Sequence, residues 1–297
     1  MSFPPEAFII GAQRSGTTSL SSLLDQHPDV VLSTPKEPDF FSVNWDQGLE
    51  WYRARFRRLD ATLIDASVNY TMARPATESK ELPDTVPRRI REISPRAKFV
   101  YIVRDPGERC HSAYWHEVRA GREARSLHEV VERSVYYTMA SYYHRQISTF
   151  LGFFPLERFL IIRFEDFVRD PLGTARTCCD FFGVRPDGFE FRPEEPRNQA
   201  FLYSRFGQLL RNVMGQKGLE TLSGIASRSL PDSLRPYARR IVARGVPELS
   251  SDDRDWLAEQ FAEDAQAFAQ LTGVQVQNEP RRWQSGRDNQ PMRCSVG

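Results

Sequence analysis

The chain has 297 residues, a length that fits either two average domains or one larger α/β domain with insertions. Hydrophobic residues make up 40% and charged residues 27%, an ordinary globular composition that excludes collagen-like, disordered and disulfide-scaffold proteins. Forty basic and thirty-nine acidic side chains leave a net charge of +1, so overall charge does not favour nucleic acid or an anionic membrane as a partner. Recognition of an anion therefore has to be local.

Cysteine content and hydropathy indicate the compartment. The four cysteines show neither a disulfide framework nor zinc-ligand spacing, which predicts buried or idle thiols in a reducing compartment and no metal site. No run of about 18 apolar residues predicts a membrane-spanning helix, and the first residues lack the pattern of a secretory signal. We therefore expect a cytoplasmic protein. Four lysines against thirty-six arginines are typical of a GC-rich bacterial genome.

Five short apolar runs alternate with helical patterns along the first part of the chain. The runs cover residues 7–10, 30–32, 62–64, 99–103 and 159–162. Strands that alternate with helices predict an α/β fold, with a mostly parallel central sheet and helices on both faces. In such sheets ligands bind beyond the carboxyl ends of the strands.

The pattern changes after about residue 185. Residues 186–204 are rich in Pro, Glu, Arg and Asn and predict a long loop. Helices are expected at 209–222 and 253–271, within a helical part that covers about 205–275. We predict one domain over residues 1–283, followed by a polar tail at 284–297.

The first apolar run leads directly into a glycine-containing loop, GAQRSGTT at residues 11–18. Gly11 and Gly16 have the spacing of a phosphate-binding loop between a strand and a helix, and the backbone N–H groups of such a loop can cradle a phosphate. Thr17 stands where a nucleoside triphosphatase has lysine, and Arg14 supplies the positive charge instead. Two glycines at this spacing also occur in loops without a function. The predicted ligand-binding residues are Arg14, Ser15, Gly16, Thr17 and Thr18.

A second candidate anion site follows the fourth apolar run, in the sequence RDPGERCHSAY that begins at Arg104. Pro106 suits the first turn of a helix, which puts Arg104 at the end of a strand and Ser112 on the helix that follows. A guanidinium and a hydroxyl are suitable donors to phosphate oxygens. The alternative is a surface ion-pair cluster of Arg104 and Asp105. Two anion sites at one sheet edge suggest a ligand with two phosphate groups.

These two sequences resemble the two signature elements of the sulfotransferases, which use 3′-phosphoadenosine 5′-phosphosulfate (PAPS) as donor. The resemblance covers about residues 6–185 and is closest to glycan-type sulfotransferases related to heparan sulfate enzymes and to their bacterial relatives. It implies a P-loop-containing three-layer sandwich, a first loop that binds the 5′-phosphosulfate, and Arg104 and Ser112 as ligands of the 3′-phosphate. It also implies 3′-phosphoadenosine 5′-phosphate (PAP) as product and no required metal.

The segment between the two elements contains a candidate general base, Glu37, just before Phe40 and Phe41. In the resembling enzymes a glutamate at this place takes the proton of the acceptor hydroxyl, and a partly desolvated carboxylate suits that role. The alternative is a solvated charged turn at Lys36 and Glu37 with the two phenylalanines in the core. Asp39 is the reserve candidate. Arg14 is the second catalytic candidate; the resemblance leaves open whether it donates a proton or only positions charge.

The sequence indicates less about the acceptor site than about the donor site. Lys36, Ser67, Tyr70 and Tyr143 are candidate substrate contacts by resemblance, although simple helix packing explains Tyr143 equally well. Lys217 with Gly218, or Arg197, are candidates to complete the 3′-phosphate site.

Three functions follow from these observations. The first is transfer of the PAPS sulfonate to a hydroxyl of a glycan, lipid or secondary metabolite by in-line attack, with Glu37 as base. The second is a P-loop small-molecule kinase, against which the missing loop lysine counts. The third is a non-catalytic nucleotide-binding module.

Overall fold

The computed structural model describes residues 3–72, 84–187, 192, 201–203 and 243–276. Among these residues, five parallel strands form the central sheet in the order β2-β3-β1-β4-β5. The strands are β1 (Ala7–Gly11), β2 (Val30–Leu32), β3 (Thr62–Asp65), β4 (Lys98–Val103) and β5 (Phe159–Arg163). All five predicted strands and the parallel sheet are confirmed. The apolar runs predicted them correctly because near-continuous apolar runs are typical of strands that are covered on both faces.

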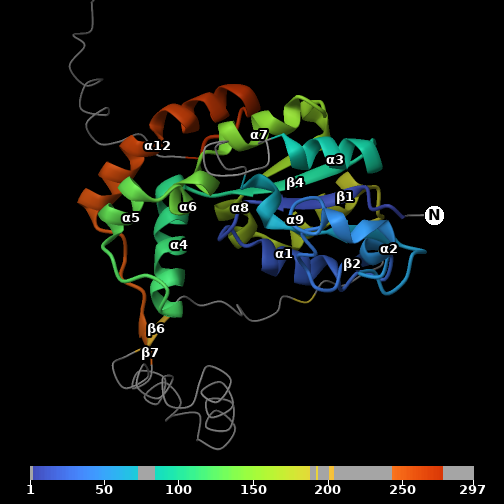
Figure 1. Ribbon diagram of the computed structural model, residues 1–297, viewed down its shortest axis with the longest axis horizontal. Coiled ribbons are helices and arrows are strands. Elements are labelled where there is room, and N and C mark those ends of the chain that lie inside the picture. The colour runs from blue at the N-terminus through green and yellow to red at the C-terminus, as the bar shows by residue number, and fades with distance from the viewer. Residues whose placement is uncertain (1–2, 73–83, 188–191, 193–200, 204–242, 277–297) are drawn as a thin grey trace, which may run out of the picture.

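Helices cover both faces of the sheet, so the three-layer prediction is also confirmed (Figure 1). One face packs against α1 (Thr17–Leu24), α8 (Phe164–Arg169) and α9 (Pro171–Phe182). The other packs against α2 (Gly48–Arg53), α3 (Thr85–Ile93), α7 (Tyr143–Leu151) and α12 (Ser251–Thr272). The last of these confirms the helix predicted at 253–271.

A third group of helices packs at the carboxyl end of β4. It consists of α4 (Pro106–Ala120), α5 (Leu127–Arg133) and α6 (Val135–Thr138), which share a small apolar cluster with the first turns of α12. The 3-10 helices are η1 (Trp45–Gln47), η2 (Val68–Thr71), η3 (Met139–Ser141) and η4 (Leu156–Arg158).

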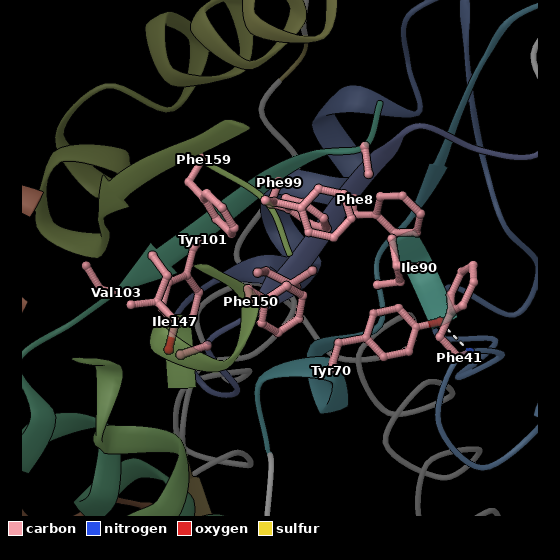
Figure 2. Close-up of a cluster of buried hydrophobic side chains, with 14 of the residues drawn as sticks. Phe8, Phe41, Tyr70, Ile90, Phe99, Tyr101, Val103, Ile147, Phe150 and Phe159 are labelled. Atoms are coloured by element: carbon pink, nitrogen blue, oxygen red, sulfur yellow. Dashed lines mark hydrogen bonds between the residues drawn. The ribbon is translucent and has the colours of Figure 1, made fainter. Parts of the chain in front are cut away.

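Phe99 on β4 is the centre of the larger core (Figure 2). Its ring stacks on Phe8 of β1 and Phe159 of β5, with centroid distances of 5.6 and 4.8 Å. Phe150 and Phe154 meet the same ring edge-on at 5.4 and 4.8 Å. Aromatic contacts of this kind add to the free energy gained by burying the rings. Three adjacent strands are therefore joined through one side chain.

The opposite face of the sheet carries smaller side chains. Ile9 and Val100 pack there with Leu20 of α1 and with Cys178 and Cys179 of α9. Both cysteines are buried and free, and burial raises the pKa of the Cys179 thiol to about 11. These two thiols are therefore apolar packing groups, as the sequence predicts.

The C-terminal part differs from the expectation at one point. The loop predicted at 186–204 is wrong at its end, because β6 (Phe201–Tyr203) pairs antiparallel with β7 (Ala243–Gly245). The strand partner lies about 40 residues further along the chain, so no local pattern could reveal it. The helix predicted at 209–222 and the polar tail at 284–297 lie outside the described residues. Within the described ranges, no helix has the length and apolar character needed to cross a membrane.

We predict that Phe99→Ala lowers the free energy of unfolding by about 3–5 kcal/mol, because it removes a buried ring and leaves a cavity between three strands. Urea denaturation followed by circular dichroism measures the change. Val168→Ala is the control, since Val168 is 59% exposed and its truncation should change stability by less than about 0.5 kcal/mol. A loss below about 1 kcal/mol for Phe99→Ala would show that Phe99 does not organise the core.

Candidate active site

The loop between β1 and α1 leaves several polar groups available to a ligand. Arg14 and Gly16 have positive φ angles of 68° and 86°, and no side chain caps the first turn of α1. The Nε atom of Arg14 and the Oγ atom of Ser15 are buried and have no hydrogen-bond partner among the residues that the structure describes. Buried polar atoms without partners are costly, so the loop fits an anion that would accept hydrogen bonds from them.

The turn between β4 and α4 holds Arg104 at the same edge of the sheet. The side chain of Asp105 caps α4 by accepting a hydrogen bond from Glu108 N at 2.9 Å, and Pro106 occupies the first turn as predicted. The hydroxyl of Tyr143 donates to the carbonyl oxygen of Arg104 at 2.8 Å, and the guanidinium of Arg104 lies 4.9 Å from the centroid of the Phe164 ring. Backbone and guanidinium of Arg104 are therefore both positioned.

One cavity of about 360 Å³ is lined by residues of both predicted anion sites, although Ser15, Gly16, Thr17 and Thr18 of the first site are not among them. Arg14 lines it from the first loop, and Arg104 and Ser112 line it from the second. This follows from the fold, because β1 and β4 are adjacent and parallel and their carboxyl ends share one edge. Further lining residues are Glu108, His111, Trp115, His116 and Arg119 of α4 and Arg254 of α12.

Among the described residues, four arginines and two glutamates line the cavity. Burial, Arg119 and Arg104 lower the pKa of the Arg14 guanidinium, and burial, Arg14 and Arg119 lower the pKa of His116. Like charges and desolvation both disfavour the cationic forms. A multiply charged anion in the cavity would relieve this repulsion, so the electrostatics match a ligand with more than one phosphate or sulfonate group.

Lys36 links the segment that contains Glu37 to the first loop. Its Nζ atom lies 2.8 Å from Glu37 Oε1 and 3.5 Å from the Oγ1 atom of Thr17, the first residue of α1. Phe40 and Phe41 are buried, and Phe40 stacks on Tyr52 with a centroid distance of 4.3 Å. The phenylalanines therefore fill the core, as the alternative interpretation of this segment predicts. Lys36, which is paired with Glu37, contacts the start of α1.

Asp39 occupies an unusual position two residues further on. Its φ angle is 50°, its Oδ2 atom accepts a hydrogen bond from Asn69 Nδ2 at 3.1 Å, and within the described residues its buried Oδ1 atom has no partner. Burial and the charges of Glu37 and Asp65 raise the pKa of Asp39 to about 6. A carboxyl that titrates near neutrality is suited to proton transfer.

Three predicted substrate contacts are buried and bind other protein groups. Ser67 Oγ donates to Asp65 Oδ1 at 2.6 Å and accepts from Asp39 N at 3.0 Å. The hydroxyl of Tyr70 donates to Asp65 Oδ2 at 2.8 Å. Tyr143 is fully buried and holds the backbone of Arg104, as described above. In the structure these hydroxyls position the site, and their direct contact with an acceptor stays a prediction.

The sequence-based prediction missed part of the cavity wall. Glu108 and Arg119 are eleven residues apart and lie on one face of α4, so helical periodicity could have indicated them. Residues 246–249 and Arg254 also line the cavity, and only the packing of α12 on α4 brings them there. Lys217, Gly218 and Arg197, the expected C-terminal contributors, lie outside the described residues.

Comparison with known proteins agrees with this geometry. Residues 5–187 match the sequence model of a family described as the sulfotransferase family. The chain belongs to the sulfotransferase family. The matched region contains both loops, the Lys36–Asp39 segment and all five strands of the central sheet.

Curated relatives of this sulfotransferase-family chain include heparan sulfate enzymes. Heparan sulfate glucosamine 3-O-sulfotransferase 6 of Mus musculus is 31% identical over 189 residues, which is 61% of this chain and 53% of that protein. Bifunctional heparan sulfate N-deacetylase/N-sulfotransferase 2 of Homo sapiens is 26% identical over 202 residues, 61% of this chain and 22% of that protein. The chain thus spans about half the length of the first relative.

A solved structure covers nearly the whole fold. The crystal structure of a sulfotransferase from Alicyclobacillus acidocaldarius aligns with a TM-score of 0.63 and 25% identity, and the alignment covers 94% of this chain and 98% of that one. The likeness therefore extends beyond residue 187 into the part of the chain that contributes α12.

We predict that Gly16→Ala destabilises the protein and weakens PAP binding. The residue has a φ of 86°, and a Cβ there would lie 3.1 Å from the Phe164 ring; positive φ in a non-glycine residue costs about 1–3 kcal/mol before any clash. Gly48→Ala is a matched control, because Gly48 has a φ of 78° but open space around it. Thermal unfolding and calorimetric titration measure both variants. Equal effects of the two substitutions would contradict a tightly packed loop at Gly16.

Proposed function

We propose that this protein transfers the sulfonate of PAPS to a hydroxyl group of an acceptor. The observation that supports it best is the single cavity into which Arg14, Arg104 and Ser112 all open. One ligand with phosphate groups at two places satisfies both anion-binding turns, and PAPS has that chemistry. Membership of the sulfotransferase family supports the same donor.

The residues present fit this donor. Arg14 Nε and Ser15 Oγ are buried donors without partners in the described chain, and we assign them with Gly16, Thr17 and Thr18 to the 5′-phosphosulfate. Arg104 and Ser112 are assigned to the 3′-phosphate. PAPS supplies an activated sulfonate and a phosphate leaving group. Arg14 and the loop N–H groups are preorganised to stabilise negative charge on the leaving oxygen, as in the related case of phosphoryl transfer.

Glu37 is the proposed general base. Its carboxylate is 2.8 Å from the ammonium of Lys36, which in turn lies 3.5 Å from Thr17 Oγ1, so the base is joined to the donor loop through one side chain. A base has to be within hydrogen-bond reach of the hydroxyl that it deprotonates. Asp39 is the alternative, favoured by its raised pKa of about 6.

The proposed acceptor is a glycan hydroxyl. The names of the relatives describe sulfation of the glucosamine of heparan sulfate, and the positive cavity wall with Arg119 suits an acidic sugar chain. Lipid and secondary-metabolite hydroxyls are the other acceptor classes to be compared. We further propose a cytoplasmic bacterial enzyme, as the cysteine and lysine contents suggest.

We predict that the protein transfers ³⁵S from labelled PAPS to an acceptor and releases PAP. Glycan, lipid and small-metabolite hydroxyls are screened in parallel by product mass and label transfer. ATP with magnesium is the matched test of the kinase alternative, and we expect no ATP consumption above a protein-free blank. Phosphoryl transfer from ATP, or failure to turn over PAPS with every acceptor class, would contradict the proposal.

The two carboxylates are distinguished by paired isosteric variants. Glu37→Gln should lower kcat about 10²-fold or more if Glu37 is the base, whereas Asp39→Asn should lower it less. PAP affinity, measured in the same variants, should stay near the wild-type value because neither carboxylate is assigned to the donor. If Asp39→Asn has the larger effect and abolishes a rise in activity with a midpoint near pH 6, Asp39 is the base.

A further inference from the structure

Glu108 bridges two arginines that come from different helices. Its Oε2 atom lies 3.4 Å from Arg104 Nη2, and its Oε1 atom forms an ion pair with Arg254 Nη1 of α12. All three side chains line the cavity beside Ser112. The first arginine is assigned above to the 3′-phosphate of the donor, and the second has no role in that assignment.

The position of Arg254 is determined by the packing of α12 on α4. A Cβ on Gly107 would lie 3.1 Å from Leu257 Cβ, so the glycine allows the two helices to approach closely. Leu257 is fully buried and, three residues after Arg254, lies on the same side of α12. The approach at Gly107 therefore brings Arg254 over the first turn of α4, where Glu108 is located.

A second contact holds the first turn of α12. His128 of α5 stacks on Trp256 with a centroid distance of 4.0 Å and lies 2.7 Å from Asp253 Oδ1 through its Nε2 atom. Asp253 N in turn donates to the side chain of Ser250, which caps the helix. Arg254 therefore extends from a fixed helical turn, and the side chain alone has to adjust to a ligand.

The charges of this group do not balance. Taken alone, the three side chains carry two guanidinium groups and one carboxylate; Glu248 also lines the cavity, and Asp105 interacts with the charge of Arg254. A phosphate monoester carries about −1.5 to −2 charges near neutral pH, and two arginines can each donate two hydrogen bonds to it. Phosphate and Glu108 would then compete for the same donors, and the carboxylate would repel the phosphate.

We propose that Arg254 is a further 3′-phosphate ligand and that Glu108 is the internal counter-ion that this phosphate replaces. The inference rests on the proposed function, because it requires a donor with a 3′-phosphate at Arg104 and Ser112. In the donor-free protein Glu108 keeps both arginines in place at the cavity wall. On binding, the phosphate takes over both guanidinium groups, which makes the site selective for nucleotides that carry a 3′-phosphate.

The test compares PAP with adenosine 5′-phosphate (AMP), which lacks only the 3′-phosphate. Isothermal titration calorimetry on the full chain gives the ratio of the two dissociation constants, which isolates the 3′-phosphate contribution. Arg254→Ala should weaken PAP binding about tenfold or more and leave AMP binding unchanged, since a charge-assisted hydrogen-bonded pair is lost. Arg254→Lys should have a PAP affinity between those of the wild type and Arg254→Ala, because lysine keeps the charge without the fork of donors.

Glu108→Gln tests the counter-ion. It removes the competing charge but keeps the side-chain shape, so PAP affinity should increase several-fold while AMP affinity stays constant. Arg169→Ala is the control for both variants, because Arg169 forms an exposed ion pair with Asp166 and does not line the cavity. Its ratio of dissociation constants should equal that of the wild type.

Two results would overturn the inference. If Arg254→Ala binds PAP as tightly as the wild type, or if its affinities for PAP and AMP fall by the same factor, then Arg254 does not bind the 3′-phosphate. If Glu108→Gln weakens PAP binding, then Glu108 supports the arginines instead of competing for them. The wild-type ratio separates this inference from the proposed function: a protein that does not prefer PAP over AMP refutes the donor itself, before any variant is compared.

Discussion

The adjacency of two parallel strands is the constraint on which the candidate site depends. β1 and β4 pair along their length, so the turns that follow them, each of which starts a helix, lie at one edge of the sheet. Each turn places an arginine at that edge, and the two guanidinium groups share one cavity wall. Such a concentration of positive charge is stable only with counter-charges. Glu108 and Glu248 line the same cavity, and a bisphosphorylated nucleotide would add further negative charge.

A buried polar network connects this edge to the core. Asp65 at the end of β3 is fully buried, and burial raises its pKa; hydroxyls of Tyr52, Ser67 and Tyr70 donate to its carboxylate. Ser67 also accepts from the backbone of Asp39. A fully hydrogen-bonded buried network fixes its members in one arrangement. The segment with the two candidate bases is thereby held at a defined place next to the first loop, although it is neither helix nor strand.

The fold could be predicted from the sequence to a large extent because its signals are local. Each sheet strand is an apolar run, and α12 shows its helical period; the β6–β7 pair was missed because its partners are distant in the chain. At the site, Arg14, Arg104 and Ser112 were found from motifs, whereas Arg254 depends on the close approach of α12 to Gly107. The position of a residue in a motif also does not show whether its side chain is buried. Tyr143 matches a family position, yet its hydroxyl donates to the backbone carbonyl of Arg104, a tertiary contact that could not be predicted from the sequence.

The most direct test of the central claim is a crystal structure of the protein with PAP bound. We expect the 5′-phosphate within the loop from Arg14 to Thr18 and the 3′-phosphate against Arg104 and Ser112, so that the nucleotide occupies the cavity that Arg14, Arg104 and Ser112 line. Density for the nucleotide at another place, or a single bound phosphate with the second arginine facing away from it, would contradict the claim that the two turns form one donor site.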